Sequence, residues 1–219
     1  TINAGTSGTI DMSAATTITS SSVADVLEIV NNTGATFTTA TNYAVTLSDT
    51  ASAANANTIM GDTTGAVTAT VTATGAVAAL NAALSNADSN NDALTLVLDA
   101  TTASASDLNT LDGKTSVAIN AGTIATMTGS ASAVKAALES GGITDDGGVV
   151  VTLDAGTAIA TDLTAIAAVT TATVDASAIT AISGTAEEAA AVVAADITTG
   201  NYTATLSGTS SAANANTIM

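Results

Sequence analysis

A long internal repeat constrains the fold of this 219-residue chain more than any other feature. The nine residues 52–60 (SAANANTIM) recur letter for letter as residues 211–219, at an offset of 159. At the same offset, residues 42–48 match residues 201–207, and both copies begin with Asn-Tyr. Self-similarity at a fixed period is typical of solenoids, propellers and other arrays. We therefore expect a repetitive architecture.

A shorter period lies inside the long one. Residues 174–184 align with residues 119–129 at an offset of 55. An Asn-Thr-aliphatic signature at residues 57–59 returns at 109–111, and residues 164–166 occupy the next equivalent place. These offsets predict one continuous repeat segment of about four units of roughly 50–55 residues. The unit boundaries fall at about 8–63, 64–114, 115–169 and 170–219.

Each unit is predicted to alternate short strands with short helices. Thr185 and Glu188 fit a capping box, in which Thr185 is the N-cap and Glu188 reaches back from the third helical position. Ser130 starts the equivalent helix one unit earlier, and Gly141-Gly142 ends it. The units therefore mix helix and strand, which places the chain in the α/β class.

The spacing of the expected strands predicts that they run parallel. Antiparallel neighbours need only two to five connecting residues, whereas parallel neighbours need a crossover of about a dozen or more. We therefore expect a parallel β/α solenoid, with an all-β solenoid or a propeller-like array as the alternatives. In the solenoid, one in-register ladder should contain Val45, Val71, Leu96, Ile119, Val151, Val174 and Ala204.

Charge and composition exclude several classes of function. The formal net charge is −17, from 19 acidic residues against two lysines. Two cations cannot neutralise a row of phosphates, so we expect no nucleic-acid partner. The chain has no His and no Cys, and a general base would have to be a carboxylate or a lysine. We therefore predict that the protein is not an enzyme.

Neither a signal peptide nor a membrane-spanning segment is recognisable. No basic segment precedes an apolar run, and no stretch approaches the roughly 18 apolar residues of a transmembrane helix. The repeat motif is interrupted at Met219, and residues 1–6 resemble residues that end a unit. We therefore interpret the chain as a segment of a longer protein, with no membrane insertion.

Two acidic loops are the candidate calcium ligands. Asp88, Asn90 and Asp92 place oxygen-bearing side chains at alternate positions, as a calcium loop does. Asp145 and Asp146 occupy the corresponding loop of the next unit. Clusters of Asn, Asp and Gly also form turns for purely local reasons. Both interpretations remain open.

A second candidate site is a row of threonines. Thr68, Thr70, Thr72 and Thr74 alternate with Ala and Val, so one strand face should carry hydroxyl groups only. Such a ladder could order water, as in ice-binding solenoids. Thr is also a favourable residue on any exposed strand, which is the alternative explanation.

A family resemblance follows from two phrases of the sequence. Residues 105–112 (ASDLNTLD) and 173–179 (TVDASAI) resemble those of giant Ala/Thr-rich repeat proteins of bacterial cell surfaces, best represented by cyanobacterial-type haemolysin-like, S-layer and motility exoproteins. The resemblance implies a secreted, very long structural or adhesive protein that is often calcium-dependent. The calcium-binding nonapeptide of toxin repeats is absent, so no ligand positions can be transferred from that motif.

These observations lead to one expected function and two alternatives. We expect a self-assembling structural repeat segment of an extracellular bacterial filament, sheath or surface layer, located at the cell surface. Its partners would be copies of itself or adjacent repeats, stacked end to end, with a cell-surface glycan as a further partner. The alternatives are a calcium-dependent adhesin and an ice-binding module.

Overall fold

The computed structural model of the chain describes residues 8–32 and 36–218 and has an α/β architecture. The helices in the described residues are α1 (Val23–Val30), α2 (Ala53–Asp62), α3 (Val77–Ala83), α4 (Ala105–Asp112), α5 (Ala131–Glu139), α6 (Ala160–Val169), α7 (Ala186–Ala194) and α8 (Ala212–Ile218). The strands are β1 (Ile10–Met12), β2 (Thr17–Ser20), β3 (Phe37–Thr39), β4 (Ala44–Leu47), β5 (Ala51–Ser52), β6 (Val67–Ala73), β7 (Ala93–Leu98), β8 (Thr102–Ser104), β9 (Ile119–Asn120), β10 (Thr126–Gly129), β11 (Ile143–Thr144), β12 (Val150–Leu153), β13 (Gly156–Ile159), β14 (Val174–Ala176), β15 (Ile179–Thr185), β16 (Ile197–Thr199) and β17 (Thr203–Ser207). No helix in the described ranges is long and apolar enough to cross a membrane.

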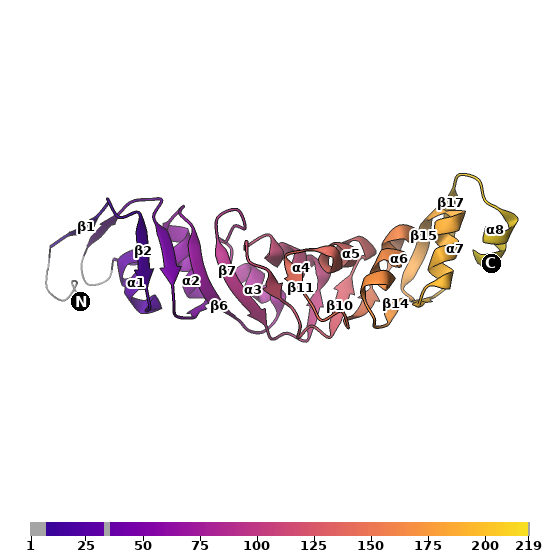
Figure 1. Cartoon of the computed structure of the whole chain (residues 1–219), viewed down its shortest axis with the longest axis horizontal. Coiled ribbons are helices and arrows are strands. Elements are labelled where there is room, and N and C mark those ends of the chain that lie inside the picture. Colours follow the sequence, from indigo (N-terminus) through magenta and orange to yellow (C-terminus); the bar gives the residue numbers. More distant parts are fainter. Residues whose placement is uncertain (1–7, 33–35, 219) are drawn as a thin grey trace. The chain divides into compact units, whose positions relative to one another are not determined.

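The chain divides into two compact units. In unit 1 (residues up to 98, and 110–119), strands β2, β4, β6 and β7 form a sheet in that order, β5 also pairs with β6, and β1 pairs with β3. In unit 2 (residues 99–109 and from 120 onward), one sheet has the order β16-β14-β12-β10-β8 and another the order β13-β15-β17. In unit 2, helices α5, α6, α7 and α8 pack side by side in sequence order (Figure 1).

The strands pair mostly in parallel, as the strand spacing predicted. Thr126 of β10 pairs with Thr102 of β8 on one side and with Val150 of β12 on the other, at equal intervals along the sequence. One helix lies in the sequence between the two strands of each of these pairs, such as α5 between β10 and β12. The prediction of parallel strands joined by helical crossovers is therefore confirmed.

Local sequence signals set where the helices begin. The side chains of Ser22, Ser52 and Ser130 accept the N–H of the third helical residue of α1, α2 and α5, which satisfies an otherwise unpaired donor. At α7, both hydrogen bonds of the predicted capping box between Thr185 and Glu188 are present. Ser211, the counterpart of Ser52, accepts the N–H of Asn214 in the same way, and α8 begins at Ala212, the counterpart of Ala53 at the start of α2.

The expected single ladder is wrong. Val45 pairs with Val67 rather than with Val71, and Ala204 pairs with Ile182 in a different sheet from Val174. The reason is that the chain bends between successive short strands. The first half of the long strand β6 pairs with β4 and its second half with β5, while β12 and β13 of unit 2 continue into two separate sheets.

Candidate functional site

The first acidic loop is held by its own hydrogen bonds. Asp92 is only 3% exposed, and its two carboxylate oxygens accept the backbone N–H groups of Val67 and Asp88, each at 3.0 Å. Oδ1 of Asp88 accepts both the backbone and the side-chain N–H of Asn90 at 2.9 Å. Burial raises the pKa of Asp92. Asp92 therefore connects this loop to the start of β6.

A groove of about 570 Å³ lies beside this loop in unit 1. Its wall includes Asp62, Asp88 and Asp92, together with residues 63–64 and Asn91. Oδ2 of Asp62 accepts the hydroxyl of Tyr43 at 2.5 Å, and burial next to this carboxylate raises the pKa of Tyr43. The groove is acidic and polar, a chemistry that suits cations or hydroxyl-rich ligands.

Asp145 and Asp146 form two consecutive local turns. Oδ1 of Asp145 accepts the N–H of Gly147 at 2.7 Å, and Oδ1 of Asp146 accepts that of Gly148 at 3.1 Å. These residues belong to unit 2, whereas the Asp88–Asp92 loop belongs to unit 1. Within the described ranges, no group of three or more Asp and Glu side chains is arranged to hold a metal ion. Calcium binding stays a prediction, which calorimetric titration of the chain with CaCl₂ would check.

The predicted threonine row lies on an exposed strand face. On β6, Thr68, Thr70 and Thr72 are exposed while the residues between them are buried, and Thr74 is exposed just after the strand. Thr68 pairs with Thr46 of β4, which pairs with Thr19 of β2. Hydroxyl groups therefore also run across the strands of this sheet.

A longer cross-strand row in unit 2 is not evident from any single strand. Neighbouring strands of the five-stranded sheet place hydroxyl-bearing residues opposite one another, with one aspartate among them. The row consists of Ser104, Thr128, Thr152, Asp175 and Thr198. Sequence reasoning missed it because the row follows the register between strands and not the alternation along one strand.

Three buried threonines, also missed in the sequence, connect successive strands. Thr63, Thr115 and Thr170 each follow a helix closely and are at most 7% exposed. Each hydroxyl donates to a backbone carbonyl that precedes that helix and accepts the N–H of the second residue after the threonine. The accepting carbonyls are those of Tyr43, Leu94 and Val149, at 2.5, 2.8 and 2.6 Å.

The next residue completes this arrangement, which we call the threonine corner. In each corner, the residue after the buried threonine donates both its backbone N–H and its hydroxyl to a single carbonyl that precedes the helix. These donors are Thr64, Ser116 and Thr171. The corners recur at the same two offsets as the Asn-Thr-aliphatic signature. A search for Thr-Thr or Thr-Ser at those offsets would have found them.

The asparagine of the repeated signature fixes the following helical segment. Oδ1 of Asn57 in α2 accepts the N–H of Asn86 at 2.7 Å, and its Nδ2 donates to the hydroxyl of Ser85. In unit 2, Nδ2 of Asn109 donates to the carbonyl of Ala133 in α5 at 2.9 Å. These side chains therefore join each helix to a later segment of the chain.

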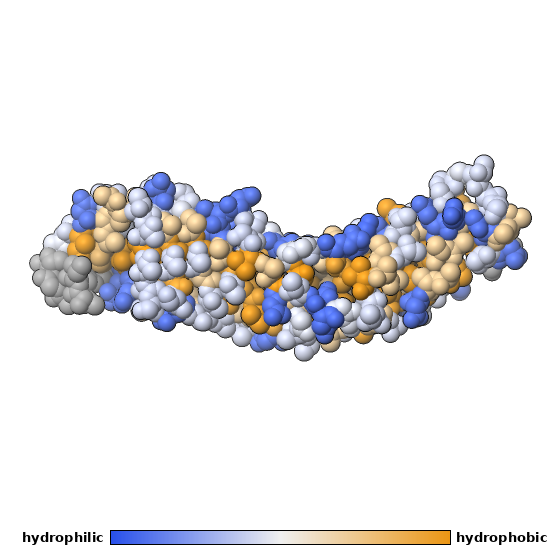
Figure 2. Space-filling view, viewed as in Figure 1, coloured by the Kyte–Doolittle hydropathy of each residue, from blue (hydrophilic) through white to orange (hydrophobic). Residues whose placement is uncertain are grey.

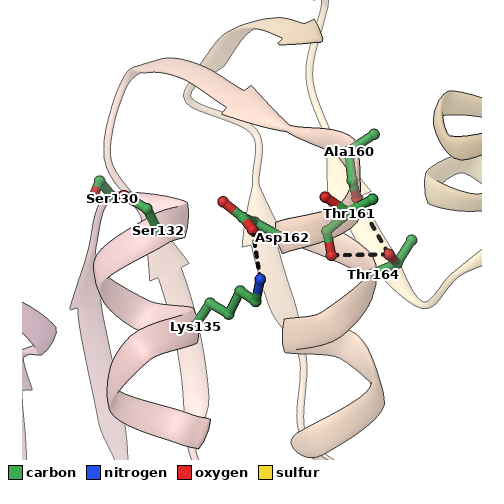
Figure 3. Close-up of polar contacts among 7 residues, drawn as sticks. All are labelled: Ser130, Ser132, Lys135, Ala160, Thr161, Asp162 and Thr164. Atoms are coloured by element: carbon green, nitrogen blue, oxygen red, sulfur yellow. Dashed lines mark hydrogen bonds and ion pairs between the residues drawn. The ribbon is translucent and has the colours of Figure 1, made fainter. Parts of the chain in front are cut away.

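Both lysines also join neighbouring segments. Nζ of Lys135 in α5 lies 3.0 Å from Oδ1 of Asp162 in the first turn of α6, where a carboxylate also interacts favourably with the helix dipole (Figure 3). In unit 1, Nζ of Lys114 donates to the carbonyl of Leu84 just after α3, at 2.8 Å. The cations therefore stabilise packing between helices.

Replacing Lys135 with methionine should lower the midpoint of thermal unfolding, because Asp162, 8% exposed, would lose its cation. The hydrogen bond and the attraction to Asp162 raise the pKa of Lys135 above 10.5. The lysine therefore stabilises the fold fully below pH 10.5, and this contribution is lost as the pH rises through the raised value. The difference in thermal midpoint between wild type and Lys135→Met, measured by calorimetry, should be smaller above pH 11 than at pH 7. Lys135→Arg keeps the cation and should retain most of the stability.

Asp92→Asn should lower the free energy of unfolding by about 1–2 kcal/mol at pH 7, because an amide cannot accept at both positions. Burial raises the pKa of Asp92 from 3.8, so the folded chain binds this proton more tightly than the unfolded chain. The stability of wild type relative to Asp92→Asn should therefore fall as the pH rises from about 3.8 through the raised pKa, and then stay constant. Urea denaturation between pH 3 and 7 measures this.

The matched control is Asp146→Asn, which removes the same charge from an exposed turn. It should change the free energy of unfolding by less than about 0.5 kcal/mol. Equal effects of the two substitutions would contradict the role of Asp92.

Comparison with known proteins gives no further assignment. No protein-family model, curated protein or solved structure matches the chain.

Proposed function

We propose that the chain is a structural repeat segment of an extracellular bacterial filament, sheath or surface layer, whose repeats stack end to end. The recurrence of the threonine corner at Thr63, Thr115 and Thr170 carries this proposal. At each corner, buried side-chain hydrogen bonds join the segment after a helix to the segment before that helix. Repeated bonds of this kind favour a stiff scaffold.

We further propose that the fold is a parallel β/α solenoid, in which each of the four units contributes two coils. A coil is one helix with the strands that precede it. In support, helices α2, α4, α6 and α8 begin at positions 53, 105, 160 and 212, and helices α1, α3, α5 and α7 begin at positions 23, 77, 131 and 186. Within each series, successive helices are separated by nearly the period of the shorter sequence repeat.

The chemistry of the side chains is consistent with a passive, extracellular role. The chain has 19 acidic residues and only two lysines, so it offers few sites to trypsin-like proteases. At the ionic strength of sea water, the screening length falls to a few ångströms, so a net charge of −17 costs little stability. The threonine corners and both lysines join neighbouring segments of the fold, as expected of a passive scaffold.

Immunogold electron microscopy of the producing cells, with antibodies to this chain, tests the function. We expect label on continuous extracellular filaments or layers. Electron diffraction from aligned material should then give a reflection at about 4.8 Å along the filament axis, from strands stacked in parallel. Label confined to the cell interior would contradict the proposal.

A second function, ice binding, is favoured by the cross-strand hydroxyl row of unit 2. Its members recur at the strand spacing of about 4.8 Å, so this face of the sheet presents a regular array of donors and acceptors. Thermal hysteresis of the dilute chain would support this function. Thr152→Lys should abolish the hysteresis, whereas Thr209→Lys, on an exposed loop outside the row, should not.

A further inference from the structure

The sequence contains two Asp-Gly pairs, Asp112-Gly113 and Asp146-Gly147. The backbone nitrogen of a residue that follows Asp can attack the Asp side-chain carboxyl group and close an imide ring. Gly favours this reaction, because it has no side chain to shield its nitrogen or to restrict its backbone. The two pairs lie in different local structures, and these structures decide how readily each pair reacts.

The second pair lies in the loop between β11 and β12 of unit 2. Oδ1 of Asp146 accepts the N–H of Gly148 at 3.1 Å, which closes a turn around Gly147. The ring closed by this hydrogen bond contains Cγ, Cβ, Cα and the carbonyl carbon of Asp146, together with the nitrogen of Gly147. These are the atoms of the imide ring, so the turn already curls the carboxyl group back towards the nitrogen that would attack it.

The neighbouring carboxylate of Asp145 holds the same nitrogen. Its Oδ1 accepts the N–H of Gly147 at 2.7 Å, a short, charge-assisted hydrogen bond. A carboxylate in this position polarises the N–H bond and can take the proton that the nitrogen loses. The N–H of Gly148 stabilises the negative charge that develops on the carboxyl oxygen of Asp146 during the attack. The loop therefore supplies both a proton acceptor and a hydrogen-bond donor for the reaction.

Water can reach the reacting atoms. Asp146 is exposed, and Gly147 has a φ of +72°. No heavy atom lies within 4 Å of the position that a Cβ would take at Gly147. Hydrophilic residues also reach the surface around α5, the helix that precedes this loop in the sequence (Figure 2). The peptide bond between Asp146 and Gly147 is therefore open to solvent on one side.

The first pair is held in a different geometry. Asp112 is the last residue of α4, where the side chain points back towards the start of the helix and away from the nitrogen that follows. The carbonyl of Gly113 accepts the N–H of Ser89 at 3.2 Å, which fixes the peptide after the helix. We therefore expect Asp112 to react much more slowly than Asp146, although the two pairs have the same letters.

The carbonyl of Gly147 is part of the third threonine corner. Thr171 donates its backbone N–H to this carbonyl at 2.8 Å and its hydroxyl at 3.1 Å. The buried Thr170 beside it donates to the carbonyl of Val149 at 2.6 Å. Any covalent change of the backbone at Asp146 therefore moves a carbonyl on which this corner depends.

We propose that Asp146 converts spontaneously to isoaspartate and that this change loosens the third threonine corner. The nitrogen of Gly147 bonds to Cγ of Asp146, and one carboxyl oxygen leaves as water with the N–H proton and one proton from solvent. Water then adds to the former backbone carbonyl carbon of Asp146 and breaks its bond to the nitrogen. The main chain now runs through Cβ and Cγ and is one atom longer, with a free carboxylate on Cα. Nothing is oxidised or reduced, and the mass of the chain is unchanged.

Ageing of the purified chain at physiological temperature tests the reaction. Peptide mapping by electron-transfer dissociation, which distinguishes isoaspartate from aspartate, should find at least about tenfold more isoaspartate at residue 146 than at residue 112. A form lighter by one water should appear first. Asp146→Glu should abolish the change at this position, because a longer side chain would have to close a larger ring. Asp145→Asn should slow it, because an amide oxygen is a weaker proton acceptor than a carboxylate.

Hydrogen exchange measures the effect on the corner. The backbone N–H of Thr171 should exchange at least about tenfold faster in the aged chain than in the fresh chain. The N–H of Ser116, which donates to the carbonyl of Asp92 at 2.9 Å in the second corner, is the matched control and should not change. Aged Asp146→Glu should exchange like fresh wild type at both positions.

Two results overturn the proposal. Aspartate that stays unchanged at residue 146, or isoaspartate at residue 112 to the same extent, shows that the loop does not promote the reaction. Isoaspartate at residue 146 without faster exchange at Thr171 shows that the corner tolerates the longer backbone. Both measurements use the purified chain, so neither depends on the extracellular role proposed above.

Discussion

Thr115→Val should be among the most destabilising substitutions in this protein, lowering the free energy of unfolding by about 2–4 kcal/mol. Thr115 is 4% exposed, and its hydroxyl makes three hydrogen bonds. It donates to the carbonyl of Leu94 and accepts the N–H of the same residue, both at 2.8 Å, and it accepts the N–H of Val117 at 3.1 Å. Valine has the same shape but satisfies none of these groups, which would stay buried without partners.

Two controls separate the hydroxyl from the methyl group. Thr115→Ser keeps the three hydrogen bonds and should recover most of the stability. Thr70→Val, on the exposed face of β6, should change the free energy of unfolding by less than about 0.5 kcal/mol. Urea denaturation monitored by circular dichroism measures all three, and a loss at Thr70 equal to that at Thr115 would refute the threonine corner as a stabilising element.

Gly65→Ala should lower the free energy of unfolding by at least about 3 kcal/mol, because backbone atoms occupy the position that a methyl group would take. A Cβ at Gly65 would overlap the carbonyl group of Tyr43 and would lie 2.7 Å from the carbonyl oxygen of Asn42. Relief would require the backbone to move. That backbone is held in place by the hydrogen bond from Thr63 to the carbonyl of Tyr43 and by the pairing of Val67 with Val45.

Gly141→Ala is the matched control for Gly65→Ala. No heavy atom lies within 4 Å of the position that a Cβ would take at Gly141, so the substitution should be nearly neutral. Thermal unfolding of both variants by calorimetry is the measurement. A Gly65→Ala protein as stable as Gly141→Ala would show that the corner can widen without loss.

The helices, their caps and the parallel pairing were predictable because they depend on short stretches of sequence. The capping box of Thr185 and Glu188 involves residues three apart, so its letters are sufficient to locate it. The connections between expected strands are too long for hairpins, which favours parallel pairing. The alternation of Thr and Val in β6 likewise predicted its exposed face.

The roles of the candidate acidic residues were less predictable. The alternating spacing of Asp88, Asn90 and Asp92 predicts a calcium loop, and the same spacing also makes a turn. Only the approach of Val67 shows that Asp92 is a buried acceptor for another segment. This contact depends on the register between β6 and β7, in which Thr68 pairs with Ala93, and the spacing of residues within the acidic loop does not reveal that register.

The sequence by itself determined the periodicity and the α/β class, since these follow from recurring letters and local propensity. Only the tertiary structure decided how the strands divide among sheets and which small residues are indispensable. The third residue of the threonine corner is Gly65 in one unit but Val117 and Ala172 in the others, so the sequence alone suggests that a side chain is tolerated there. The structure forbids a side chain at Gly65 because the backbone of residues 42–43, which precede α2, occupies the position that a Cβ would take. Such distances depend on how neighbouring segments pack, and no local pattern records them.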